Sequence, residues 1–104
     1  MDLSQRDGGL PPDHVVQDAD TILADSERLI AKYHDRSGAS MVQIALAPCS
    51  PFSATKRLMR ETAELAEKHD CRLHTHLGET EDENRFCEET FGCRPLDYLE
   101  EVGW

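Results

Sequence analysis

Two histidines and a glutamate lie close together in the stretch LHTHLGET (73–80). One residue separates His74 from His76, and Glu79 follows the second histidine by three positions. If residues 72–77 form a strand, both imidazoles point to the same face, because side chains alternate along a strand. Glu79 would then lie on the loop that follows. A histidine at a strand end with a carboxylate beside it is the pattern by which α/β enzymes build metal-dependent hydrolytic sites.

Each of these residues also has a structural interpretation that the spacing leaves open. His76 can be a ligand of Zn²⁺ or Fe²⁺, or a hydrogen-bonded histidine at a strand end. Glu79 can carry protons, or it can stabilise the start of the next helix, where acidic side chains are common. We expect His74 to be buried on the inward face below His76, where it could support that ligand through a hydrogen bond.

The segments around this stretch alternate between helical and extended patterns. Apolar residues recur at helical spacing in some segments, and other segments are short, nearly continuous apolar runs. An apolar run of strand length indicates a strand buried on both faces, as in a parallel sheet covered by helices. The expected order is a helix over 18–34, a strand over 41–47, a helix from 53 or 55 to 69, a strand over 71–77, and helices over 81–91 and 95–102.

Two strands joined by a helix of this length predict a parallel β-α-β unit with a right-handed crossover. Two strands alone are too few for a parallel sheet that is covered on both faces. The alternation therefore indicates a slice of a larger barrel or doubly wound sheet. Residues 1–16 contain Gly8-Gly9 and Pro11-Pro12 without sustained periodicity, and they predict a loop or extended arm.

The loop after the first expected strand carries further candidate residues. Loops at the carboxyl ends of parallel strands open on the same side of the sheet. Cys49, Ser50 and Ser53 are therefore expected to line a substrate pocket beside His76. A nucleophilic Cys49 would need a neighbour that stabilises its thiolate, and the sequence identifies none, so we favour pocket lining.

The composition fits one modest soluble domain of 104 residues, of which 38% are hydrophobic. A net charge of −10 argues against nucleic acid as a partner, because phosphate contacts require an excess of lysine and arginine. The sequence contains no run long enough to cross a membrane and no secretory leader, which predicts a cytoplasmic protein without a membrane partner. The four cysteines lack CxxC spacing, which argues against a zinc ribbon or a disulfide scaffold.

Three motifs in this order resemble the amidohydrolase superfamily: LAPCSPFS (46–53), LMRETAELA (58–66) and RLHTHLGET (72–80). The resemblance is greatest to the branch of 8-oxoguanine deaminases and triazine hydrolases. Segments 7–30 and 91–104 are also similar to the 8-oxoguanine deaminase group, so the resemblance covers nearly the whole chain. It implies an α/β chain that forms part of a (β/α)₈ barrel, with about the fourth and fifth strands and their flanking helices.

The resemblance also implies roles for individual residues. In the family, the histidine of an H-x-x-E motif after the fifth strand binds the metal, which corresponds to His76. The glutamate of that motif, here Glu79, transfers protons. The implied cofactor is one divalent metal, Zn²⁺ before Fe²⁺, whose bound hydroxide attacks a heteroaromatic ring and releases ammonia or an amine. The implied partner is a small aminopurine-like substrate such as 8-oxoguanine, with a triazine as the alternative, and the full-length protein is expected to form homo-oligomers.

The sequence also departs from the family pattern. The HTH of 74–76 could be mistaken for the family's first-strand H-x-H pair, but the preceding LAPCSPFS and the following Glu79 place it at the fifth strand. No other H-x-H, no sixth-strand histidine and no eighth-strand aspartate occurs in the 104 residues. A catalytic zinc needs three or more protein ligands, so we expect residues 1–104 to be an inactive fragment of one catalytic barrel.

Two interpretations from other classes remain open. An acidic helical surface, formed by 81–89 with Glu100 and Glu101, could bind a basic partner without any catalysis. A flavodoxin-like domain is the other possibility, although the sequence lacks a glycine-rich phosphate loop between strand and helix.

Overall fold

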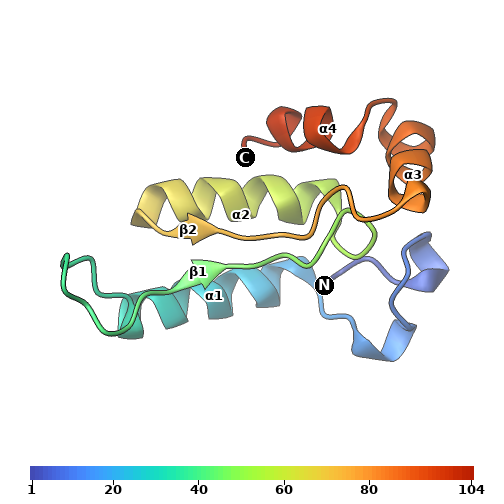
Figure 1. Cartoon of the computed structure of the whole chain (residues 1–104). Coiled ribbons are helices and arrows are strands. Elements are labelled where there is room, and N and C mark those ends of the chain that lie inside the picture. Colours follow the sequence, from blue (N-terminus) through green and yellow to red (C-terminus); the bar gives the residue numbers. More distant parts are fainter.

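The computed structural model describes residues 1–104 and shows four α-helices and a two-stranded parallel sheet, with α3 and α4 beyond one end of the sheet (Figure 1). The strands are joined through a helix, which makes the predicted parallel β-α-β unit. No helix combines the length and the apolar character needed to cross a membrane. In chain order the elements are the 3₁₀-helices η1 (Gln5–Asp7) and η2 (Asp13–Val15), then α1 (Ala19–Tyr33), β1 (Ala45–Leu46), α2 (Lys56–His69), β2 (Arg72–Leu73), α3 (Glu81–Phe91) and α4 (Pro95–Glu101).

The helices begin and end close to the predicted residues because their stop signals are local. The Asp18 side chain accepts a hydrogen bond from the Thr21 amide and caps α1. Thr55 caps α2 in the same way, which decides between the two cap residues expected there. Gly92 ends α3 with a φ of 74°, a left-handed conformation that glycine adopts without strain.

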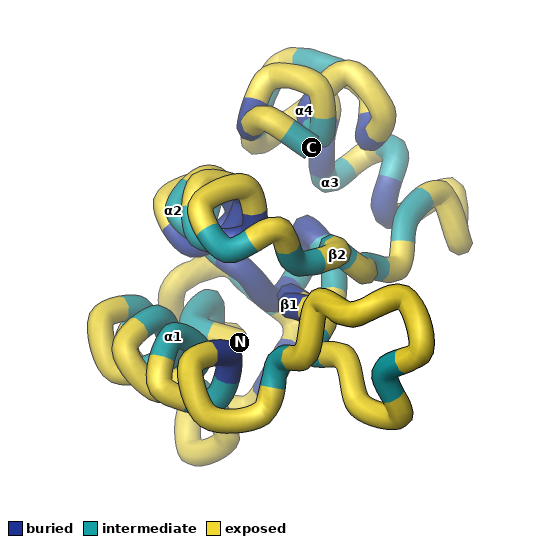
Figure 2. The backbone as a smooth tube through the Cα atoms, turned by 90° about the vertical axis from the view of Figure 1, so that its left-hand side faces the viewer, coloured by how far each residue is buried: buried dark blue, intermediate teal, exposed yellow.

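Helix α2 is the centre of the packing, because its buried residues face two separate apolar clusters. One cluster joins Ile30 of α1 to Leu46 of β1 and Ala66 of α2. The second joins the start of α2 to α4, and Tyr98 at its centre is fully buried and stacks on Phe91 at 4.0 Å between ring centroids. Figure 2 shows α2 between α1 and α4, with the sheet beside it.

The strands are much shorter than predicted, and the predicted burial of 41–47 on both faces is wrong. Each strand has only two assigned residues, and Met41 and Val42 are 96% and 54% exposed. Leu46 is the buried apolar residue of β1. The physical reason is that no third strand pairs with either edge of the sheet, so most of the apolar run has nothing to pack against.

The N-terminal arm was expected to be a loop, but residues 1–16 contain two short 3₁₀-helices and pack against the chain. Ser4 is fully buried. A side chain at Gly9 would place its Cβ 2.5 Å from the Leu3 carbonyl oxygen and 2.7 Å from that of Phe52, so only glycine fits there. The arm thus lies directly against the loop that follows β1.

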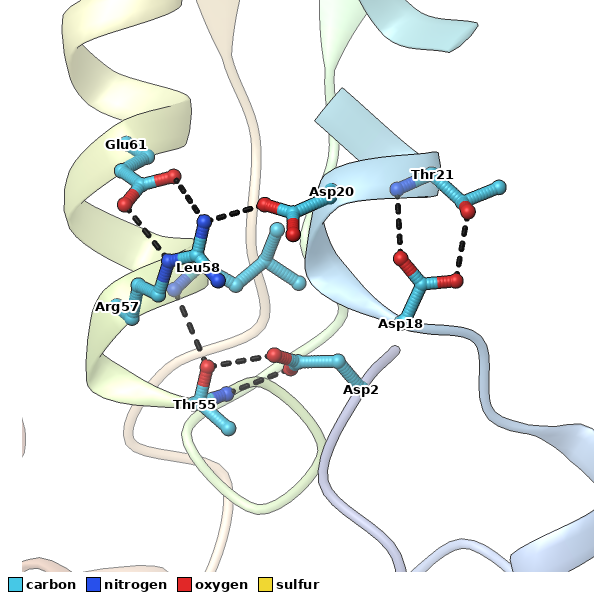
Figure 3. A network of polar contacts seen from close by, with 8 residues as sticks. All are labelled: Asp2, Asp18, Asp20, Thr21, Thr55, Arg57, Leu58 and Glu61. Atoms are coloured by element: carbon cyan, nitrogen blue, oxygen red, sulfur yellow. Dashed lines mark hydrogen bonds and ion pairs between the residues drawn. The ribbon is translucent and has the colours of Figure 1, made fainter. Parts of the chain in front are cut away.

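Asp2 makes the most specific of the arm's contacts. Its carboxylate accepts hydrogen bonds from the Thr55 amide at 2.7 Å and from the Thr55 hydroxyl at 2.5 Å (Figure 3). The same hydroxyl oxygen caps α2 by accepting from the Leu58 amide at 3.1 Å. The N-terminus and the first turn of α2 are therefore one connected network.

An ion-pair network beside it joins α1 to α2. The Arg57 guanidinium lies between Glu61 of its own helix and Asp20 of α1, and these two carboxylates raise its pKa (Figure 3). All three side chains are substantially exposed to solvent, so water and salt screen the attraction. This network orients the two helices but adds less to stability than the apolar clusters do.

Replacement of Asp2 by alanine tests whether the arm stabilises α2. We expect Asp2→Ala to lower the free energy of unfolding by about 1–2 kcal/mol, because the variant loses two hydrogen bonds to a carboxylate at a helix start. Urea titration followed by circular dichroism measures this. Glu89→Ala, which removes an exposed carboxylate without hydrogen bonds, is the matched control. Equal unfolding free energies for the two variants would contradict the role of Asp2.

Candidate active site

The two histidines project from the same side of the chain just after β2. Their ring centroids are 5.5 Å apart in an edge-to-face arrangement, which confirms the expectation that His74 and His76 share a face. The expected burial of His74 is wrong for this chain, because both side chains are exposed. The face is open because the two-stranded sheet has no neighbouring strand that could cover it.

A backbone carbonyl fixes the orientation of His76. Its Nδ1 lies 2.9 Å from the carbonyl oxygen of Cys49, and the His76 amide donates to the same oxygen at 2.9 Å. A carbonyl oxygen can only accept, so Nδ1 carries a proton and donates it. In the neutral imidazole Nε2 is then unprotonated, with a lone pair free for a metal. Metal-binding histidines in proteins are oriented by this kind of hydrogen bond.

His76 fits the chemistry of a metal ligand, but the chain does not bring a complete set of metal ligands together. His76 is exposed, and the hydrogen bond of its Nδ1 to the Cys49 carbonyl oxygen leaves Nε2 as the nitrogen that could bind a metal. However, no group of three or more histidine, cysteine, aspartate or glutamate side chains in the chain is arranged to hold a metal ion. His76 could therefore offer one ligand to a metal such as zinc, whereas a complete zinc site would need three or more protein ligands.

The loop after β1 approaches His76 as predicted, but its residues differ in position. Cys49 is exposed, and its Sγ lies 3.8 Å from His76 Nδ1. The Ser53 side chain is buried, and its hydroxyl donates to the Ser50 carbonyl oxygen at 3.3 Å within its own turn. The Ser50 and Ser53 hydroxyl oxygens are 3.4 Å apart. Cys49 thus lies beside the histidine, whereas the roles of Ser50 and Ser53 in substrate binding remain predictions.

The carboxylate of Glu79 makes no hydrogen bond within the chain, so it is not a hydrogen-bonding cap of α3. Thr80 is the N-cap of α3, and its hydroxyl accepts from the Glu83 amide at 3.2 Å. The carboxylate of Glu83 accepts from the Glu79 amide at 2.8 Å. The helix start is therefore satisfied without the Glu79 side chain, which is exposed and makes no hydrogen bond within the chain. Gly78, with a φ of 68°, forms the turn between His76 and Glu79.

Three further residues shape this site and were not predicted from the sequence. Thr75 donates from its hydroxyl to the Cys49 carbonyl at 3.2 Å, Asp2 binds the start of α2, and Glu83 binds the Glu79 amide. For Glu83 a signal was present, because a threonine followed three residues later by glutamate is the capping-box pattern. The other two bind partners that lie 26 and 53 residues away, and no local sequence pattern indicates such contacts.

The profile of the Amidohydrolase family matches residues 8–103 of this chain. The chain belongs to the amidohydrolase family. It is 64% identical over all 104 residues to an 8-oxoguanine deaminase of Pseudomonas aeruginosa, and covers 23% of that protein. It is 38% identical over 102 residues to a hydroxydechloroatrazine ethylaminohydrolase of a Pseudomonas species, covering 98% of this chain and 21% of that protein.

A solved structure supports the same family relationship. An atrazine chlorohydrolase from Arthrobacter aurescens, complexed with zinc, superposes with a TM-score of 0.94 at 33% identity. The match covers 100% of this chain and 23% of the chlorohydrolase. The chain thus spans about a fifth to a quarter of the length of the relatives it matches. The resemblance to the amidohydrolases, which was first drawn from three short motifs, is confirmed.

Chemical labelling can test the arrangement of the thiols. Burial raises the pKa of Cys87 to about 11, with the nearby Glu83 carboxylate adding to the shift, whereas Cys49 is exposed. We expect iodoacetamide at pH 8 to modify Cys49 at least about tenfold faster than Cys87, because only an accessible thiolate reacts. Peptide mass spectrometry over time measures both rates. Equal rates at the two cysteines would show that α3 does not pack as described.

Proposed function

We propose that this chain is the segment of an amidohydrolase that supplies one metal ligand and the proton-transferring carboxylate for hydrolytic deamination of an aminopurine-like base. The main support for an aminopurine-like substrate is the 64% identity, over the whole chain, to an 8-oxoguanine deaminase. The free Glu79 carboxylate and the oriented His76 ring support the chemistry. The activity belongs to a longer protein, because the chain spans 23% of that relative.

The cofactor of the complete site is proposed to be one divalent metal, Zn²⁺ before Fe²⁺. When bound, such a metal supplies a water whose pKa is lowered towards neutrality. Nε2 of His76 would hold the metal, and the hydrogen bond to the Cys49 carbonyl keeps the ring in that orientation. The structural relative crystallised with zinc supports the choice of metal.

Glu79 is proposed to move the protons. Its carboxylate would accept a proton from the attacking water and pass it to a ring nitrogen of the base. It would then carry the proton of the newly formed hydroxyl group to the amino group, so that the C–N bond breaks and ammonia leaves while the carbonyl group forms. His74 would support His76 from the same face, and Cys49 would line the substrate pocket beside it. Such a carboxylate works well when burial and nearby charge bring its pKa close to the working pH.

The architecture is proposed to be part of a (β/α)₈ barrel, with β1 and β2 as about the fourth and fifth strands. The two unpaired sheet edges and the match over the whole chain to a quarter-length segment of a larger enzyme support this. The homo-oligomer, the cytoplasmic location and the absence of nucleic acid or membrane partners remain predictions. The flavodoxin-like interpretation is wrong, because the chain belongs to the amidohydrolase family.

A triazine is the second candidate substrate. The 38% identity to an ethylaminohydrolase and the structural match to an atrazine chlorohydrolase support it. These identities are well below the 64% to the 8-oxoguanine deaminase, so we place the purine-like base first. A non-catalytic acidic surface, formed by residues 81–89 with Glu100 and Glu101, remains the alternative from another class. Salt-sensitive capture of a basic partner without dependence on metal would favour it.

The fragment is expected to be inactive alone, because one ligand cannot hold a catalytic metal. The 104-residue chain with added Zn²⁺ should release no measurable ammonia from 8-oxoguanine. A chimera in which this chain replaces the aligned segment of the Pseudomonas aeruginosa deaminase should restore turnover. A coupled ammonia assay measures both. Turnover by the chain alone that is comparable to the chimera's would overturn the fragment interpretation.

Two substitutions in the chimera separate metal binding from proton transfer. Glu79→Gln should keep the bound metal and lower kcat by about 10²–10⁴-fold, since the amide cannot accept the proton. His76→Ala should lose metal and activity together. Metal content by atomic emission and steady-state kinetics measure the two effects, with Glu89→Ala as the exposed control. An unchanged kcat in Glu79→Gln would refute the proposed role of this glutamate.

A further inference from the structure

Glu83 is the buried carboxylate in an otherwise exposed acidic helix start. It is 1% exposed, whereas its neighbours Glu81 and Asp82 are exposed. Its Oε2 accepts a hydrogen bond from the Glu79 amide, and its Oε1 is buried without any hydrogen-bond partner. No lysine, arginine or histidine forms an ion pair with it. Burial of a carboxylate oxygen without a hydrogen-bond partner lowers the stability of the folded chain. This cost suggests that Glu83 has a role other than stabilising the fold.

Helix capping explains only part of this arrangement. Thr80 is already the N-cap of α3 and accepts from the Glu83 amide. In the usual capping box, the glutamate returns to the amide of the cap residue itself. Here Glu83 reaches one residue further, to the amide of Glu79. The carboxylate therefore holds the residue proposed to carry protons.

The loop between the two proposed catalytic positions needs such a restraint. Only Leu77 and Gly78 separate His76 from Glu79. Gly78 has a φ of 68°, and no atom lies within 4 Å of where a Cβ would be, so no contact restrains the turn at this residue. The Cys49 carbonyl fixes the His76 end, and the Glu83 carboxylate fixes the Glu79 end.

We propose that Glu83 is a positioning residue that sets the place of the Glu79 carboxylate relative to His76. It acts through the Glu79 backbone amide and does not touch the substrate. The inference rests on the proposed function of Glu79 in proton transfer. Catalytic groups must be held within a few tenths of an ångström, and a displacement of about 1 Å can cost about 100-fold in rate.

The test uses the chimera described above, with three variants of Glu83. Glu83→Ala removes the acceptor and should lower kcat at least about tenfold, with metal content and KM unchanged within about twofold. Glu83→Gln keeps an oxygen that accepts from the Glu79 amide, and should restore kcat to within about threefold. Glu83→Asp, one methylene shorter, should remain folded and still lose kcat. The control is Glu81→Ala, an exposed carboxylate of the same helix turn.

Hydrogen exchange at the Glu79 amide provides a readout that is independent of activity. The amide should be protected in the parent and in Glu83→Gln, and should exchange faster in Glu83→Ala and Glu83→Asp. Parental kcat in both Glu83→Ala and Glu83→Asp overturns the inference, as does a loss of kcat that follows loss of metal or of folded protein. Lost kcat with undiminished amide protection also overturns it.

Failure of this inference can be told from failure of the proposed function. If Glu79→Gln is inactive while Glu83→Ala is fully active, Glu79 keeps its role and only the positioning by Glu83 is wrong. If Glu79→Gln is fully active, the proposed proton transfer is wrong, and the inference on Glu83 falls with it.

Discussion

The Cys49 carbonyl oxygen is the point on which the arrangement of the site depends. It accepts from the amide and Nδ1 of His76, both at 2.9 Å, and from the Thr75 hydroxyl at 3.2 Å. These contacts join the loop after β1 to the segment after β2, beyond the last assigned strand residues. They also decide which imidazole nitrogen is free. Because the acceptor is a backbone atom, the identity of the side chain at position 49 does not enter into this interaction.

The two loops that meet at this oxygen are held from outside by carboxylates. Asp2 binds the amide and hydroxyl of Thr55, where the first loop enters α2, and Glu83 binds the amide of Glu79 in the second loop. A carboxylate that accepts from a backbone amide is a strong restraint, because the hydrogen bond is charge-assisted. The same kind of restraint thus acts on both loops, although Asp2 and Glu83 lie far apart in the sequence.

Features that depend on residues close together in the chain, such as helix ends, could be predicted from the sequence. Features that depend on residues far apart in the chain could not. The ends of α1, α2 and α3 were predictable, since Asp18, Thr55 and Gly92 act within a few residues of each helix end. Strand lengths were not, because a strand extends only as far as a neighbour pairs with it. Spacing and family resemblance selected His76 and Glu79 as candidate site residues, and their roles stay predictions. Asp2, whose partner Thr55 lies 53 residues away, gave no signal in the sequence.

The exposure of His76 and Glu79 explains why correct local geometry need not give activity. In water the attraction between charged or polar groups is weak, and it strengthens several-fold when a low-dielectric surrounding excludes solvent. The open sheet edges and the exposed histidine face leave both side chains in solvent here. The chain therefore encodes orientation, which needs only hydrogen bonds between near neighbours. The proposed activity would also need further metal ligands and surroundings that exclude water, and the 104 residues bring neither together around His76 and Glu79.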